Sequence, residues 1–118
     1  MALILDLPWP DRRLHPNARV HHMVKARAAK MARLSTAWLA RTSGLHRIQA
    51  SALSVKIVFS PPDSRGRDLD GMLSNIKSHL DGVADVIGID DRHWRLSLER
   101  SEPVKGGNVR IIIKEIVA

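Results

Sequence analysis

Residues 52–82 read ALSVKIVFSPPDSRGRDLDGMLSNIKSHLDG, and this passage from a strand into a helix decides the fold. Apolar and polar side chains alternate over 52–59, which is typical of a half-buried β-strand closed by Ser60-Pro61-Pro62. A polar, arginine-bearing loop follows over 63–67. The helix expected over 70–82 turns four apolar side chains inward, namely Met72, Leu73, Ile76 and Leu80.

The rest of the chain adds three strands and one long helix. Pro8 ends the first strand because proline cannot donate into a strand ladder, and Asn17 is placed to N-cap the long helix. Lys105-Gly106-Gly107-Asn108 supplies the flexible residues that a hairpin turn between the last two strands requires. The order β-α-β-α-β-β predicts one α+β domain over residues 1–118, with a mixed sheet and helices packed on it. The expected elements are strand 2–7, helix 18–42, strand 52–59, helix 70–82, a short apolar turn over 83–91, strand 93–100 and strand 109–117.

The long helix is expected to present two neighbouring faces, because its side chains recur at about 100° per residue. The core-facing stripe comprises Val20, Val24, Ala28, Met31, Leu34 and Trp38. A basic stripe beside it comprises Arg19, Lys30, Arg33 and Arg41, with Arg27 at its edge.

Composition narrows the class of protein. The 118 residues carry 19 Lys and Arg against 12 Asp and Glu, a net charge of +7, with 44% hydrophobic residues and no cysteine. The chain therefore has no disulfide, thiolate metal site or thiol nucleophile. It shows no signal-peptide pattern, no apolar run near the roughly 20 residues of a membrane span, and no phosphate-binding or dinucleotide glycine motif. We expect a cytoplasmic protein with no membrane association and no nucleotide cofactor.

The excess positive charge lies in the first half of the chain. Residues 1–50 hold nine Lys and Arg against two acids, which gives +7, whereas residues 51–118 hold ten of each. A basic half beside a balanced half predicts a surface that binds a polyanion. A solubilising face is the alternative that composition leaves open.

Four carboxylates stand where strands and helices meet. Asp68-Leu69-Asp70 opens the second helix, and Asp90-Asp91 precedes the next strand. In an extended stretch the carboxylates of Asp68 and Asp70 project to the same side. Mg²⁺ prefers such hard oxygen ligands and keeps waters for substrate phosphates, so these acids predict a magnesium site. The alternative is structural, with Asp68 capping the helix and Asp90-Asp91 forming a turn.

Several short motifs occur in a fixed order along the chain. Leu7-Pro8-Trp9-Pro10 follows the first strand, Arg67-Asp68-Leu69-Asp70 precedes the amphipathic helix, and Asp90-Asp91 and Lys105-Gly106-Gly107 come after it. Together they resemble the RusA-type Holliday junction resolvases, and residues 80–92 resemble the version in phage and prophage members. The resemblance implies a RusA-like fold and a homodimeric endodeoxyribonuclease, bacterial or phage-encoded. Such an enzyme needs Mg²⁺, with Mn²⁺ as a substitute, and nicks four-way DNA junctions in recombination and repair.

The resemblance also assigns roles to particular residues. The implied catalytic and metal-binding acids are Asp68, Asp70 and Asp91. Asp90 is the fourth ligand of the magnesium site that the residues themselves predict. The family has a functional lysine one turn after its acid pair, where this chain has Ser74. Lys77 is the nearest lysine and is assigned as the catalytic lysine. Asn17 is the counterpart of the asparagine in the family's N-terminal motif. Charge and position predict the remaining contacts to DNA phosphates, which together with Asn17 are Arg19, Arg27, Lys30, Arg65 and Arg67.

Two other functions remain open at the level of sequence. One is a magnesium-dependent nuclease with a broader set of branched DNA substrates, such as flaps and forks. The other is a non-catalytic DNA-binding module whose acids serve only as caps and turns. An aromatic content of 3% disfavours base stacking on single strands as the main mode of binding.

Overall fold

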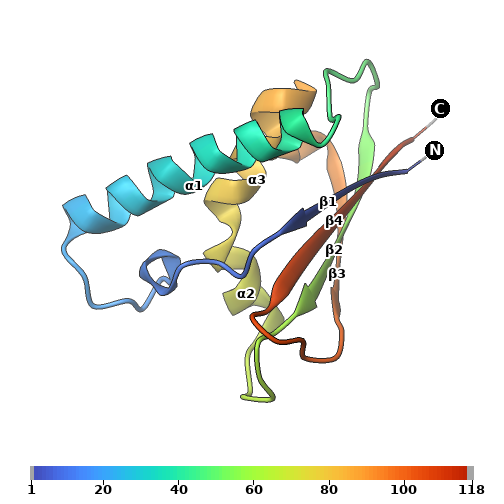
Figure 1. Cartoon of the computed structure of the whole chain (residues 1–118). Coiled ribbons are helices and arrows are strands. Elements are labelled where there is room, and N and C mark those ends of the chain that lie inside the picture. Colours follow the sequence, from blue (N-terminus) through green and yellow to red (C-terminus); the bar gives the residue numbers. More distant parts are fainter. Residues whose placement is uncertain (1, 117–118) are drawn as a thin grey trace.

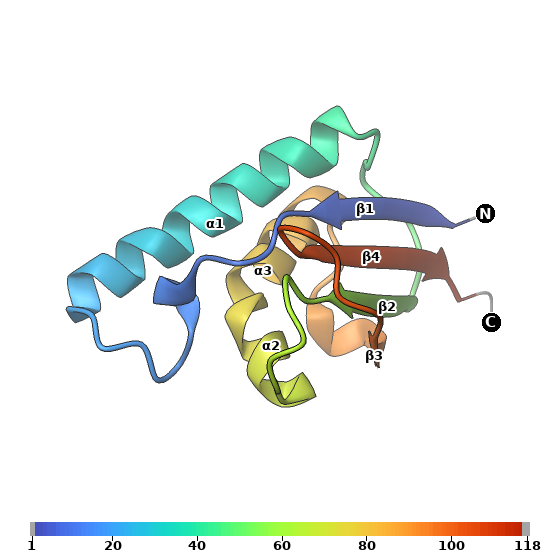
Figure 2. The same cartoon turned by 60° about the horizontal axis from the view of Figure 1, so that its bottom comes forward.

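The computed structural model describes residues 2–116 and shows helices layered on one face of a sheet (Figures 1 and 2). The elements are β1 (Leu3–Leu7), a 3-10 helix η1 (Arg12–Leu14), α1 (His22–Thr42), β2 (Leu53–Ser60), α2 (Leu69–Asn75), α3 (Lys77–Ile87), a 3-10 helix η2 (Asp91–His93), β3 (Trp94–Arg100) and β4 (Asn108–Glu115). The chain is one α+β domain with a mixed sheet, as the sequence predicts. In this described part, no helix combines the length and apolar character that crossing a membrane requires.

The sheet has four strands in the order β1-β4-β2-β3. β4 pairs antiparallel with β1 and with β2, whereas β2 and β3 are parallel and are connected through α2 and α3. The alternation predicted for 52–59 is confirmed, because every second side chain of β2 is fully buried under the helices. The central core side chains of the sheet are Leu53, Val55, Ile57 and Phe59 from β2 and Val109, Ile111 and Ile113 from β4.

The predicted hairpin between the last two strands is wrong. β3 and β4 lie on opposite sides of β2. The connection over 101–107 passes the end of β2, where the Ser101 amide donates to the Phe59 carbonyl at 2.8 Å. β4 has three fully buried side chains and takes an interior position, whereas the mostly exposed β3 takes the edge. The order of the strands follows from how deeply each one is buried, and the residues of a turn carry no information about burial. Residue 117, which the sequence assigns to the last strand, lies outside the described residues.

The second helix is broken into two. The helix expected over 70–82 is instead α2 and α3, which meet at the buried Ile76, whose φ is −106° and ψ is 9°. The turn expected over 83–91 is also wrong, because α3 continues to Ile87 and ends at Gly88, whose φ of +76° is left-handed. Apolar side chains beyond the predicted end are buried in the core, and this burial extends the helix.

The long helix begins later along the chain than the sequence predicts. α1 starts at His22, and His21 is its N-cap, with ring Nδ1 accepting a hydrogen bond from the Met23 amide at 3.1 Å. Asn17 is therefore not the N-cap, although asparagine is the more common cap residue. It lies in the preceding loop, where its backbone N–H donates to Nδ1 of His15 at 3.0 Å.

Small residues form the side of α1 that enters the core. The buried ones are Ala28, Ala32, Thr36, Ala37 and Ala40. The predicted orientation of this helix is therefore wrong. Most of the predicted core stripe is exposed: Val20, Met31 (59%), Leu34 (56%) and Trp38 (66%), while Val24 is half-buried and only Ala28 is buried.

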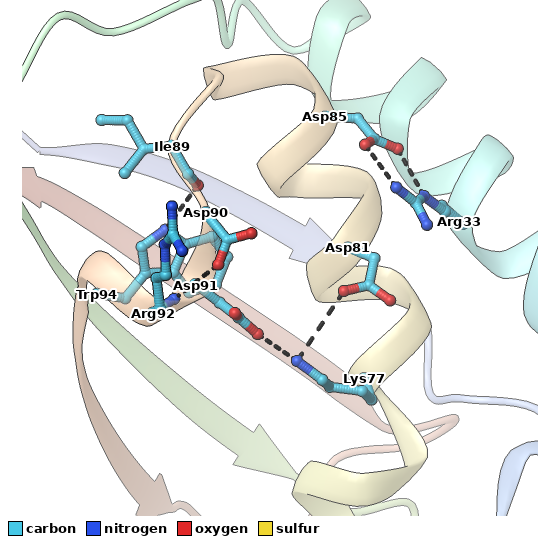
Figure 3. A network of polar contacts seen from close by, with 9 residues as sticks. All are labelled: Arg33, Lys77, Asp81, Asp85, Ile89, Asp90, Asp91, Arg92 and Trp94. Carbon is cyan, nitrogen blue, oxygen red and sulfur yellow. Dashed lines mark hydrogen bonds and ion pairs between the residues drawn. The ribbon is translucent and has the colours of Figure 1, made fainter.

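Close packing of α1 against α3 explains that orientation. A Cβ added to Gly82 would lie 2.4 Å from the Arg33 carbonyl oxygen and 3.2 Å from the Ala37 amide nitrogen. Only small side chains fit between the two backbones, so the large ones lie on the opposite side of α1. The Arg33 guanidinium donates two hydrogen bonds to Asp85, of 2.7 and 2.8 Å, which lower the pKa of the Asp85 carboxyl (Figure 3).

Replacing Gly82 with alanine should destabilise the protein by about 1–3 kcal/mol, because the added methyl group forces the α1 and α3 backbones apart. The midpoint of urea denaturation measures the change. Gly71→Ala is the matched control, since a Cβ there meets nothing closer than 3.9 Å and should raise stability by about 0.5–1 kcal/mol. Equal stability of the Gly82→Ala protein and the wild type would contradict the close contact.

Candidate functional site

A lysine and a carboxylate from separate elements meet at one end of α3. The break at Ile76 makes Lys77 the first residue of α3, and Asp91 opens η2 ahead of β3. The Lys77 ammonium donates a hydrogen bond to the Asp91 carboxylate, and an Asp81 carboxylate oxygen lies 4.0 Å from the same ammonium (Figure 3). One cation is therefore shared between carboxylates of two elements.

This ion pair shifts the pKa of both partners. The hydrogen bond from Lys77 is the main reason that the pKa of the Asp91 carboxyl lies below its ordinary value of 3.8. The same bond raises the pKa of the Lys77 ammonium above 10.5, and the charges of Asp81 and Asp90 add to the effect. Both groups are thus ionised at neutral pH. Because both side chains are partly in solvent, the pair contributes little to folding stability.

Asp90 caps the short helix in which Asp91 lies. Its carboxylate accepts a hydrogen bond from the Arg92 amide at 3.0 Å. The buried indole of Trp94 donates to the Ile89 carbonyl at 3.0 Å and holds the same turn from inside (Figure 3). The structural role that the sequence allows for Asp90 is therefore confirmed, and the anchored turn places Asp91 beside α3.

Asp68 and Asp70 lie at the start of α2. Asp68 occupies the N-cap position, yet its carboxylate makes no capping hydrogen bond. Asp70 is exposed in the first turn, and Ser74 bonds only to its backbone carbonyl, at 3.0 Å. Within residues 2–116 neither carboxylate has a hydrogen bond or an ion pair. Both side chains can therefore accept a cation without breaking another contact.

The four predicted acids do not gather at one point. Lys77 bonds to Asp91 and not to the Asp68–Asp70 pair, because the break at Ile76 ends the helical phase that the sequence predicts. In the described residues no three His, Asp or Glu side chains lie close enough to hold a metal ion together. Mg²⁺ commonly uses one or two carboxylates and completes its shell with water and phosphate oxygens, so the oxygen donors of Asp68 and Asp70 fit it. The metal-binding roles of all four acids stay predictions.

Contacts within the arginine loop order it. The Arg67 guanidinium donates from Nη1 to the Asp63 carboxylate at 2.9 Å and lies over the Trp9 ring, 5.6 Å from its centroid. The Arg67 side chain is only 20% exposed. Arg65 extends into solvent, although its backbone amide donates to Asp63 at 3.0 Å and its guanidinium lies 3.9 Å from the same carboxylate. Arg67 is thus held in place, whereas Arg65 offers an exposed charge.

The other predicted DNA contacts are spread over α1 and the loop before it. Asn17 and Arg19 line an open cavity of about 620 Å³ together with two further arginines of the same loop. Arg27 and Lys30 are exposed on α1, on the side that carries the large apolar residues. The structure therefore distributes these cations along the loop and the helix and does not bring them to one point.

The sequence patterns did not identify two further candidate residues, Asp81 and His15. Asp81 follows Lys77 by one helical turn, and this (i, i+4) spacing of opposite charges could have identified it. His15 lines the same cavity as Asp68, although the two residues belong to different elements. No sequence spacing connects His15 with Asp68, so only the tertiary structure reveals that pair.

The fold and these side chains define a single α+β domain with a lysine–carboxylate pair at a helix–strand junction. No protein-family model matches the chain. An uncharacterized protein of Xylella fastidiosa (strain Temecula1 / ATCC 700964) is 43% identical to it over 93 residues, which cover 76% of this chain. The match covers 61% of that protein, so the chain spans less than two thirds of the relative's length.

Replacing Lys77 with alanine should raise the pKa of the Asp91 carboxyl toward 3.8, because the main cause of its low value is removed. A pH titration of the side-chain carboxyl ¹³C resonance measures this value. Lys56→Ala is the control, since Lys56 pairs with Glu99 on the sheet and should leave Asp91 unchanged. An Asp91 titration that is the same in the Lys77→Ala protein and the wild type would show that the pair does not form in solution.

Proposed function

We propose that this chain is a RusA-like, Mg²⁺-dependent endodeoxyribonuclease that resolves four-way DNA junctions by paired nicks. The hydrogen bond between Lys77 and Asp91 carries the proposal. The resemblance assigns both residues to one active centre, and nothing in the local sequence requires them to meet. Their contact therefore supports a shared role.

The chemistry of the side chains is consistent with phosphodiester hydrolysis. Mg²⁺, or Mn²⁺ in its place, would supply an activated water and offset charge on the reacting phosphate. Asp68 and Asp70 would hold the ion, and Asp90 and Asp91 would not share it, because no three acids of the described residues lie close enough to hold it together. The ammonium of Lys77 would stabilise negative charge in the transition state, and Asp81 and Asp91 would keep it in position.

The distribution of cations supports binding to duplex DNA. Phosphate contacts give affinity without reading sequence, which suits an enzyme that recognises the shape of a junction. Arg19, Arg27, Lys30 and Arg65 are exposed and would hold phosphates of the duplex arms. Arg67, which lines the same cavity as Asp68, would contact the strand nearer to the acids, and Asn17 would contact DNA beside Arg19.

The proposal includes a homodimer, because a four-way junction has approximate two-fold symmetry that two identical active sites match. The outer side of α1 offers a surface for the second copy, since exposed side chains as large as Leu34 and Trp38 commonly mark interfaces.

The deciding experiment compares cleavage of a labelled four-way junction, a flap and a plain duplex over a titration of Mg²⁺. Metal-dependent paired nicks in the junction alone support the resolvase. Cleavage of the flap at a similar rate would favour the broader branched-DNA nuclease. Binding of the junction without cleavage at any metal concentration would favour the non-catalytic module.

Replacing Asp70 with asparagine should abolish junction cleavage while junction binding is retained or tightened. The substitution removes an oxygen donor for the metal and also a charge that repels phosphate. Single-turnover cleavage and fluorescence anisotropy measure the two effects separately. Glu115→Gln serves as the control, because this exposed acid lies at the far end of β4. Wild-type cleavage by the Asp70→Asn protein would refute the metal-site assignment.

Replacing Leu34 with glutamate should shift the protein from dimer to monomer, because the charge would be buried against the second copy. Sedimentation velocity at several concentrations reports the change. Ile4→Glu is the matched control, since Ile4 is also exposed but lies on the edge strand β1. Dissociation by Ile4→Glu and not by Leu34→Glu would place the interface on the sheet edge instead.

A further inference from the structure

A small cavity joins the loop before α1 to the start of α2. It has a volume of about 300 Å³ and is lined by His15, Gly66, Arg67, Asp68, Gly71, Met72 and Asn75. Two of these residues are glycines, so part of its wall is bare backbone. Two others, His15 and Arg67, carry N–H groups on an imidazole ring and a guanidinium.

The contact between Asn17 and His15 determines which nitrogen of the His15 ring carries the proton. The backbone N–H of Asn17 donates to Nδ1 at 3.0 Å, so Nδ1 acts as the acceptor and bears no hydrogen. The neutral ring must therefore carry its hydrogen on Nε2. Within residues 2–116, Nε2 of His15 makes no hydrogen bond. The ring thus offers one N–H donor to a ligand.

The Arg67 side chain is held before any ligand arrives. Stacking on Trp9 and the bond from Nη1 to Asp63 restrain the guanidinium, which is largely buried. Among the described residues, Nε and Nη2 of Arg67 have no hydrogen-bond partner. A restrained guanidinium loses little rotamer freedom when it binds a planar or tetrahedral oxyanion.

Two acceptors of the cavity also lack a hydrogen-bond partner. The Asp68 carboxylate has no partner in the described residues, and Oδ1 of Asn75 is buried without one. An anion with only acceptor oxygens would bind to the two donors, and water beside it could donate to Asp68 and Asn75. A phosphodiester with its bound water has this combination of groups.

We infer that this cavity is a phosphodiester subsite, in which Nε2–H of His15 and the guanidinium of Arg67 hold one phosphate of a DNA strand beside Asp68. The inference rests on the proposed function only for the source of the phosphate. His15 is assigned as a phosphate-binding residue that acts through a neutral N–H group and not through charge. A phosphate held there lies next to the acid that the proposal assigns to the metal.

The first test does not require nuclease activity. Long-range ¹H–¹⁵N spectra of histidine-labelled protein should show the Nε2–H form of His15, and adding the dinucleotide TpT, which has a single phosphodiester, should shift the Nε2 resonance. The shift should disappear in the Arg67→Gln protein. His46 serves as the internal control, because it is exposed beyond the other end of α1 and should not shift. An Nδ1–H form of His15, or no shift at saturating TpT, would overturn the inference.

The second test measures junction affinity in an Asp70→Asn background, in which DNA is bound without being cut. His15→Ala should weaken affinity about threefold to tenfold, the effect of one lost hydrogen bond, with an unchanged salt dependence. Arg67→Gln should weaken affinity and also lower the slope of log K against log salt by about 0.9, because a phosphate charge is no longer neutralised. His46→Ala is the control. Parent-like affinity of the His15→Ala protein overturns the subsite even if the junction is cleaved. A shift with TpT but no junction cleavage by the wild type would refute the proposed function and leave the subsite standing.

Discussion

The approach of α1 to α3 at Gly82 is the constraint on which the rest of the structure depends. Because glycine has no Cβ, the two backbones come close enough for the Arg33–Asp85 pair to join the helices. Alanine and threonine therefore form the core side of α1, and the large side chains of that helix face solvent. The contact also holds α3, so it determines where Lys77 lies relative to the sheet.

The candidate site follows from two points of the α2–α3 segment, namely the break between the helices and the start of α2. At the break, Ile76 enters the core and α3 starts afresh, which directs Lys77 to Asp91 in the turn before β3. At the start of α2, Asp68 lies in a cavity with His15 and a restrained Arg67. The α2–α3 segment thus contributes Lys77 to an ion pair and Asp68 to a pocket whose donors are the His15 ring and the Arg67 guanidinium. In the proposed function, this arrangement would bind the phosphate that is then attacked.

The charge available to a polyanion is smaller than composition suggests. Arg13 is paired with Asp11 and Arg33 with Asp85, so two of the basic residues in the first half are already neutralised. Hydrogen bonds from Arg13 lower the pKa of Asp11 to about 2, which shows how closely that pair is joined. The exposed cations that remain are interspersed on α1 with large apolar residues. The outer side of α1 therefore presents cations and large apolar side chains together.

The amino-acid sequence by itself determined the strands, the single α+β domain and the position of the four acids where strands and helices meet. Alternation, proline stops and turn residues act over a few neighbouring positions, so local sequence is enough to reveal them. It could not determine which side of α1 enters the core. Hydrophobicity ranks methionine, leucine and tryptophan above alanine, whereas the contact at Gly82 selects for small size. The place of β4 between β1 and β2 also depends on burial on both sides, which no turn signal encodes. Only the tertiary structure decided that Lys77 meets Asp91, since the packing of α3 brings together two residues that local spacing leaves apart.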